Sequence, residues 1–122
     1  MREIYSNISI IGGGLIGSLA ALSSSNLGYS VSLVDKNSFK KANNTERDMR
    51  TVAISEGSKQ FLDKINVWKE ISKFSEPIKK IKIIDRSLSN LIDFNNFRRG
   101  SNLGYIVKNQ KLLEIILNQL KK

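Results

Sequence analysis

"ISIIGGGLIGSLAALSSSNLGYSVSLVDK", residues 8–36, is the stretch that decides the fold. The β-branched run IYSNISII predicts a buried strand that ends at Ile11. Apolar residues then recur at helical spacing over Leu15–Leu27, and Gly28 supplies the left-handed residue that commonly closes a helix. YSVSLVD alternates like a strand and stops at Asp35. Because the connections are short, the order predicts a right-handed, parallel βαβ unit.

The turn between the first strand and the helix has the pattern G-x-G-x-x-G, formed by Gly12, Gly14 and Gly17. The first glycine permits a sharp turn, the second lets the backbone approach a pyrophosphate, and the third allows the helix to pack on the sheet. The helix begins at Leu15 and Ile16, whose N–H groups would face the phosphates. These five residues are therefore candidate dinucleotide-binding residues.

Asp35 ends the second strand, near the offset of about 20 residues at which an acid accepts hydrogen bonds from the adenosine ribose. Glycine turns also occur for packing alone, but here the strand, helix, second strand and terminal acid are all present. This context favours dinucleotide binding. The acid disfavours a 2′-phosphate and so disfavours NADP, whereas the glycines do not separate FAD from NAD.

The composition restricts the chemistry that the chain can perform. With 122 residues the chain has the size of one ordinary domain, and it contains neither cysteine nor histidine. Thiolate metal sites, thiol nucleophiles and histidine bases are therefore excluded. The net charge is +9, but the lysines are spread from Lys36 to Lys122, which favours a solvated surface over nucleic-acid binding. We expect no signal sequence or membrane span, and a cytoplasmic location.

The rest of the chain predicts a loop, helices and a small β region. KNSFKKANNTERDM reads as a polar loop and RTVAIS as a short strand. EGSKQFLDKINVWKEISKF predicts one or two amphipathic helices, with Phe61 and Trp68 in the core and Pro77 ending the segment. IKKIKIID, NLIDFNN and LGYIVK predict three antiparallel strands, the first two joined by a Ser/Asn turn. NQKLLEIILNQLKK predicts a closing amphipathic helix.

Residues 48–71, DMRTVAISEGSKQFLDKINVWKEI, carry a family resemblance. This segment is similar to the one that follows the flavin fingerprint in the ubiquinone-biosynthesis hydroxylases, FAD-dependent monooxygenases of the para-hydroxybenzoate hydroxylase class. The D-x-R-x-x-A-[IL]-S pattern, the later tryptophan, PIKKIKIIDRS and LGYIVKNQKLLEIIL follow in the order of that family. The likeness runs from Ile4 to Leu120.

The resemblance implies roles for individual residues. The three glycines would hold the FAD pyrophosphate and Asp35 the adenosine ribose. Lys36 stands where the family often has a basic residue beside the adenosine, and Arg50 matches an arginine that reaches the flavin cofactor. The alternative for Arg50 is an exposed strand residue. Asn109 stands where relatives often place a polar residue or arginine against the cofactor.

The resemblance also implies an activity and partners. Such enzymes let reduced flavin react with oxygen and transfer one oxygen atom to an activated aromatic ring, with NAD(P)H as electron donor of the full-length enzyme. The substrate would be a prenylated phenol or quinol precursor of ubiquinone. Such a substrate suggests peripheral association with the inner membrane and other subunits of a ubiquinone-biosynthesis complex as partners.

The chain departs from the family at two cofactor motifs. It contains neither an Asp-Gly nor a Gly-Asp dipeptide. We therefore expect an N-terminal part that is incomplete relative to the full family fold, supplies the ADP-binding half of the site and does not complete a catalytic cycle alone. The predicted fold class is α/β: a Rossmann-like βαβ FAD-binding unit, then helices and a small antiparallel β region. The predicted divisions are 1–75 (FAD-binding), 76–108 (substrate-side β region) and 109–122 (returning helix).

Two other classes of function remain open at this point. One is a stand-alone regulatory domain that senses NAD or another adenine nucleotide. Such domains repeat βα units after the acid, whereas a polar loop and DMRTVAIS follow here. The other is an interaction module that keeps the fold as a scaffold. Exposed apolar patches would be its signature.

Overall fold

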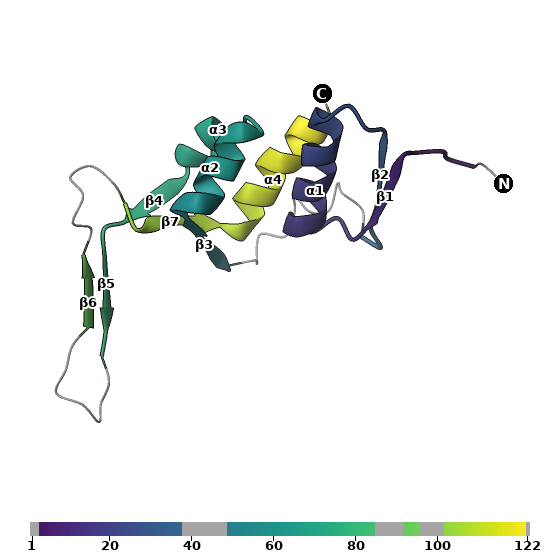
Figure 1. Cartoon of the computed structure of the whole chain (residues 1–122). Helices are drawn as coiled ribbons and strands as arrows, with labels where there is room; N and C mark the ends of the chain where they lie inside the picture. Colours follow the sequence, from purple (N-terminus) through teal and green to yellow (C-terminus); the bar gives the residue numbers. More distant parts are fainter. Residues whose placement is uncertain (1–2, 38–48, 85–91, 96–101, 122) are drawn as a thin grey trace.

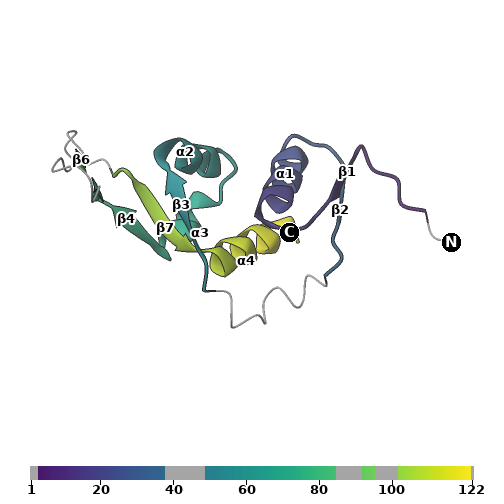
Figure 2. The ribbon, with the colours of Figure 1, turned by 90° about the horizontal axis from the view of Figure 1, so that it is seen from below.

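The computed structural model describes residues 3–37, 49–84, 92–95 and 102–121. These residues form an elongated α/β molecule with a helical middle and a two-stranded sheet at each end (Figure 1). Turned by 90°, the helices and the middle sheet still separate the two end sheets (Figure 2). In this described part of the chain, no helix combines the length and apolarity that a membrane-spanning segment needs.

The N-terminal end is a strand–helix–strand unit. It consists of β1 (Ile8–Ile11), α1 (Leu15–Asn26) and β2 (Val31–Val34). β1 and β2 pair in parallel, with Ile8 opposite Val31 and Ile11 opposite Val34. Gly28 has a φ of +89°, so it takes the left-handed conformation expected after the helix. The predicted parallel βαβ order is therefore present, with strands shorter than the sequence pattern suggested.

The middle of the molecule packs helices on an antiparallel sheet. Its elements are β3 (Thr51–Ser55), α2 (Glu56–Lys64), α3 (Trp68–Ser72), β4 (Ser75–Ile78), β7 (Gly104–Lys108) and α4 (Asn109–Leu120). β7 lies between β3 and β4 and is antiparallel to both. Ser55 ends β3 and also caps α2, because its hydroxyl oxygen accepts a hydrogen bond from the Ser58 N–H at 3.1 Å. The predicted helical segment is thus two helices.

Pro77 lies in a strand and does not end a helix, contrary to the prediction. Helix α3 already ends at Ser72, and Pro77 lies within β4, opposite Tyr105 of β7. β4 is an edge strand, and a proline without an N–H is tolerated at an edge because one side of the strand has no ladder to complete. The prediction that Pro77 ends the helical segment was therefore wrong.

The far end is a hairpin of β5 (Lys80–Ile83) and β6 (Ile92–Asn95). The two strands are antiparallel, with Ile81 opposite Phe94 and Ile83 opposite Ile92. The first two of the three predicted strands do pair, while the third, β7, pairs with β3 and β4. The predicted Ser/Asn turn and most of the predicted polar loop lie outside the described residues. The predicted domain boundaries remain predictions.

The core is shared by the helices and by the two strands β3 and β7. Trp68 is buried and meets the ring of Tyr105 edge-on, with 4.7 Å between ring centroids. Phe61, by contrast, is 41% exposed, so its predicted place in the core was wrong. The buried cluster comprises Leu22, Ile54, Leu62, Ile65, Val67, Trp68, Ile71, Val107, Leu112, Ile115 and Ile116.

Candidate dinucleotide-binding turn

The glycine turn between β1 and α1 has a conformation that requires glycine at two positions. Gly12 has a φ of +105°, a value that residues with a side chain rarely adopt. A Cβ on Gly17 would overlap the Gly12 carbonyl oxygen and lie 3.4 Å from Ile10 Cγ2. The helix therefore approaches the turn and the strand as closely as a glycine allows. These are the turn and packing roles that the spacing predicts for the first and third glycines.

Gly14 occupies the N-cap position of α1 and is exposed. A Cβ built on it would meet no atom within 4 Å, so the space beside it is open. With no side chain at the cap, the first N–H groups of α1 receive no side-chain cap bond. Leu15 and Ile16 begin the helix directly behind this open position, and the Ile16 side chain is exposed.

Asp35 reaches back from the end of β2 to the glycine turn. Its Oδ2 accepts a hydrogen bond from the Gly13 N–H at 2.6 Å, and its Oδ1 accepts one from the Asn37 N–H at 2.7 Å. The bond from Asn37, then that from Gly13, lowers the pKa of the Asp35 carboxyl below its usual value, and the charge of Lys36 acts in the same direction. The group is therefore an ionised, acceptor-only carboxylate at neutral pH.

Ser18 is a feature of this turn that sequence reasoning missed. Its side chain is fully buried, and its hydroxyl donates to the Gly13 carbonyl oxygen at 3.0 Å. Ser18 directly follows the third glycine, so a small polar residue at that place was the available signal. The helical periodicity of the segment is defined by its apolar residues, so it gave no indication that the Ser18 side chain is buried and hydrogen-bonded.

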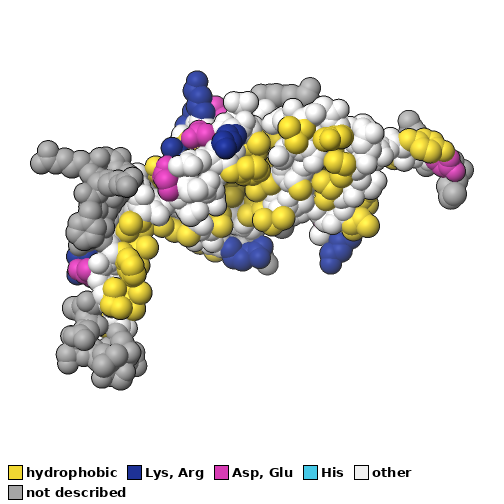
Figure 3. Space-filling view, in the orientation of Figure 1, with side chains coloured by type: hydrophobic (Ala, Val, Ile, Leu, Met, Phe, Trp, Pro, Cys, Tyr) yellow, Lys and Arg dark blue, Asp and Glu magenta, His cyan; other side chains and the backbone are white. Residues whose placement is uncertain are grey.

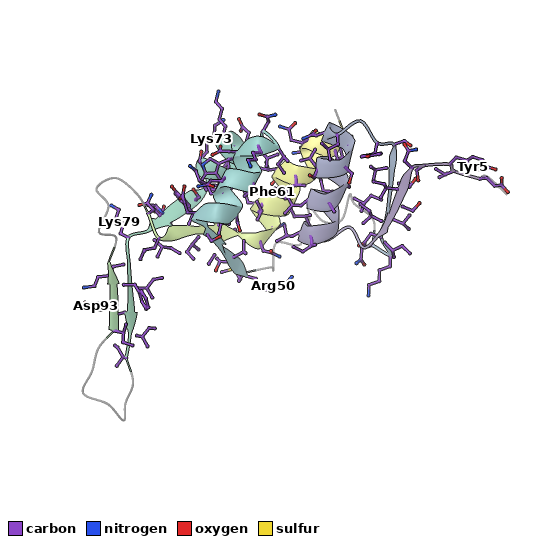
Figure 4. All side chains as sticks on the ribbon, in the orientation of Figure 1. Tyr5, Arg50, Phe61, Lys73, Lys79 and Asp93 are labelled. Atoms are coloured by element: carbon purple, nitrogen blue, oxygen red, sulfur yellow. The ribbon has the colours of Figure 1, made fainter. Side chains whose placement is uncertain are left out.

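Arg50 and Asn109 come together at another place, where β3 begins and β7 ends. The Asn109 N–H donates to the Arg50 carbonyl oxygen at 3.0 Å, next to the pair formed by Thr51 and Lys108. The Arg50 side chain is exposed at the start of β3 (Figure 4). Asp48, which opens the D-x-R-x-x-A-[IL]-S pattern, lies outside the described residues.

An apolar groove runs from the first turn of α1 to β3 and α2. Its volume is about 610 Å³, and Ile16, Ala53 and Phe61 line its three sides. Phe61 projects from the side of α2 that is nearest α4 in Figure 4, and apolar side chains gather over this middle part of the surface (Figure 3). The groove links the helix that carries the glycine turn with the strand that follows Arg50. Lys36 is exposed at the end of β2 and does not line it.

Solved structures share this fold. The chain superposes on p-nitrophenol 4-monooxygenase PnpA from Pseudomonas putida with a TM-score of 0.75 and 17% identity, covering 99% of this chain and 30% of PnpA. It superposes on a mutant of PqsL from P. aeruginosa with a TM-score of 0.76 and 14% identity, covering 95% of this chain and 30% of PqsL. These likenesses establish the fold: a mixed α/β arrangement with small sheets that resembles part of a monooxygenase structure.

In sequence, the chain is 28% identical over 114 residues to the ubiquinone hydroxylase UbiL of Rhodospirillum rubrum. The match covers 93% of this chain and 27% of UbiL, so the chain spans about a quarter of that relative's length. No protein-family profile matches the chain. The predicted resemblance to the ubiquinone-biosynthesis hydroxylases is confirmed by the match to UbiL, which supports a hydroxylase-type family.

Proposed function

We propose that this chain forms the ADP-binding part of an FAD-dependent aromatic-ring hydroxylase of ubiquinone biosynthesis. The observation that carries the proposal is the contact between Asp35 and the glycine turn, where the carboxylate accepts the Gly13 N–H at 2.6 Å. This contact places an ionised acceptor beside an exposed helix N-terminus. The match to UbiL supports the choice of a hydroxylase over other dinucleotide-binding proteins.

The residues of the turn fit the ADP moiety of FAD. The open space at Gly14 leaves room for a pyrophosphate, and the uncapped N–H groups of α1 would donate to it. The Asp35 carboxylate would accept hydrogen bonds from the ribose hydroxyls, while its charge would repel a 2′-phosphate. Lys36 would lie beside the adenosine. Arg50, which directly precedes β3, and Asn109, which begins α4, would contact the part of FAD beyond the pyrophosphate.

The oxygen chemistry belongs to the cofactor: bound FAD, reduced by NAD(P)H, would supply the oxidising power for hydroxylation. The contribution of this chain would be to hold the ADP end and to fix its orientation. We further propose a prenylated phenol or quinol as substrate of the full-length enzyme, with peripheral membrane association and other subunits of a ubiquinone-biosynthesis complex as partners. The 122 residues, lacking Asp-Gly and Gly-Asp elements, would not complete a catalytic cycle alone.

The alternative is a regulatory domain that senses NAD or another adenine nucleotide. The glycine turn and Asp35 suit the adenosine ribose of NAD as well as that of FAD. A difference lies beyond β2, because the next described strand, β3, joins an antiparallel sheet with β7 rather than extending the β1–β2 sheet. This topology favours the hydroxylase proposal.

Titration of the chain with FAD and, separately, with NAD tests the proposal, with flavin fluorescence and heat as readouts. We expect saturable FAD binding that Asp35→Ala and Gly14→Val abolish. Asp93→Ala is the matched control, because Asp93 is an aspartate on the distant hairpin. Binding of NAD but not FAD would establish the sensor instead. Binding of neither would overturn a cofactor role for this chain.

A further inference from the structure

We propose that Ser18 is a positioning residue for the ADP-binding turn, acting together with Asp35 through the two peptide groups that flank Gly13. The proposal rests on the proposed function for its ligand. Its starting point is independent of any ligand, because Ser18 is the buried polar side chain among the described residues. Buried hydroxyls are retained where they satisfy a backbone group, and this one satisfies the turn itself.

Gly13 is held on both sides. Its carbonyl oxygen accepts the Ser18 hydroxyl at 3.0 Å, and its N–H donates to Asp35 Oδ2 at 2.6 Å. Gly13 is itself buried, so neither of its polar groups is well placed to exchange its partner for bulk water. A glycine next to two other glycines has wide conformational freedom. These two side-chain bonds restrict that freedom at the centre of the turn.

Because each peptide group is planar, the two hydrogen bonds at Gly13 also restrict the orientation of the peptide groups that it shares with Gly12 and Gly14. In a trans peptide the carbonyl and the following N–H point in opposite directions. When Ser18 draws the Gly13 carbonyl toward the interior, the Gly14 N–H must therefore point away from Ser18, toward the exposed side of the turn. The bond from Gly13 N–H to Asp35 fixes the peptide on the Gly12 side in the same way. Ser18 thus sets the direction of a donor to which it has no direct contact.

The same geometry couples Ser18 to the charge on Asp35. Without the Ser18 bond, Gly13 is freer to rotate, and its N–H bond to Asp35 weakens. The pKa of Asp35 then rises toward its usual value, since that bond is one cause of its lowering, second to the bond from Asn37. Lys36 is the charged neighbour that acts on Asp35, and neither β1 nor the first turn of α1 carries a charged side chain. The coupling therefore runs through Gly13.

The test compares Ser18→Ala with Ser25→Ala, an exposed serine on the same helix. Two quantities are measured in the 122-residue chain: the pKa of Asp35, from the pH dependence of its carboxyl carbon in NMR spectra, and the affinity for ADP by calorimetry. We expect Ser18→Ala to raise the pKa of Asp35 and to weaken ADP binding by about tenfold, the effect of losing one hydrogen bond. Ser25→Ala should leave both unchanged.

A Ser18→Ala chain that keeps its circular dichroism spectrum but shows an unchanged Asp35 pKa would overturn the proposal. If Ser18→Ala unfolds, Ser18→Cys decides, because its thiol is a weaker donor of similar size. An intermediate rise in the Asp35 pKa supports the proposal, and an unchanged pKa overturns it. If the unaltered chain does not bind ADP, the proposed function fails, and the Asp35 titration alone decides the role of Ser18.

Discussion

Isoleucine side chains are buried in the middle of the molecule and exposed at its two ends. Ile71 and Ile116 are fully buried between helices, whereas Ile81 and Ile83 on the hairpin are 43% and 47% exposed. At the other end, Ile11 is 91% exposed. The middle has helices lying on a three-stranded sheet, so an isoleucine there is covered from several directions. The hairpin has no such layer among the described residues.

This difference shows that hydrophobic sequence alone does not decide burial. In β1–β2, Ile11 and Val34 lie opposite each other and are both exposed, while α1 covers the other face. Parallel sheets are normally covered on both faces, and isolated two-stranded hairpins are marginal in water. We therefore expect the free energy of local opening to be highest in the middle and lowest at the two ends.

The largest effect is expected from a core truncation. Ile71→Ala should lower the free energy of unfolding by about 2–5 kcal/mol, because it leaves a cavity among fully buried side chains. Ile83→Ala on the hairpin should change it by no more than about 0.5 kcal/mol. Urea unfolding followed by far-ultraviolet circular dichroism measures both. Equal losses at the two positions would show that the hairpin is as well packed as the middle.

A smaller effect is expected at the glycine turn. Gly17→Ala should destabilise the chain by about 1–3 kcal/mol, because the new methyl group overlaps the Gly12 carbonyl oxygen and the helix must move. Gly14→Ser is the control: its side chain enters open space and serine is a favoured N-cap residue. Thermal unfolding of both variants makes the comparison. A stable Gly17→Ala chain would mean that α1 does not hold its close approach to the turn.

The smallest effect is expected at the ion pair of the hairpin. Lys80 Nζ lies 2.8 Å from Asp93 Oδ2, and this hydrogen bond lowers the pKa of the Asp93 carboxyl. A lowered folded-state pKa adds stability above the unfolded-state value and loses it as the pH falls through the folded one. Lys80→Gln should raise the pKa of Asp93 in an NMR titration and leave the midpoint of global unfolding unchanged, since the pair is exposed.

A shifted unfolding midpoint in Lys80→Gln would contradict the weak coupling of the hairpin to the middle. Lys82 also lowers the pKa of Asp93, so Lys82→Gln gives a second, smaller shift for comparison. Lys73→Gln is the matched control, because Lys73 is an exposed lysine that pairs with Glu70 on α3 and does not act on Asp93.

The local elements were largely predictable, because their signals are local. Periodicity indicated α1 and α4, and the glycine spacing indicated the tight turn between β1 and α1. The bond from the Gly13 N–H to Asp35 was not predicted. The family motif at residues 48–71 led to the resemblance that the match to UbiL confirmed. The cofactor roles of the individual residues stay predictions.

The non-local features were not predictable in the same way. Phe61 has the helical spacing of a core residue, yet nothing among the described elements closes the groove over it. Pro77 reads as a helix terminator until the pairing of β4 at a sheet edge is known. The Ser18 bond depends on how the turn folds back on the helix, which periodicity does not record. Each of these three features depends on an element or residue that lies outside the local sequence pattern.

The contact of Trp68 with Tyr105 determines what tryptophan fluorescence can report about unfolding. Trp68 is the single tryptophan of the chain, and it sits in the middle, edge-on to Tyr105 at 4.7 Å. Its emission will follow the exposure of the middle and receive excitation from the neighbouring tyrosine. Opening of β1–β2 or of the hairpin will leave that emission unchanged. A fluorescence trace that shows one sharp transition will therefore describe unfolding of the middle and will not report the opening of the two end sheets.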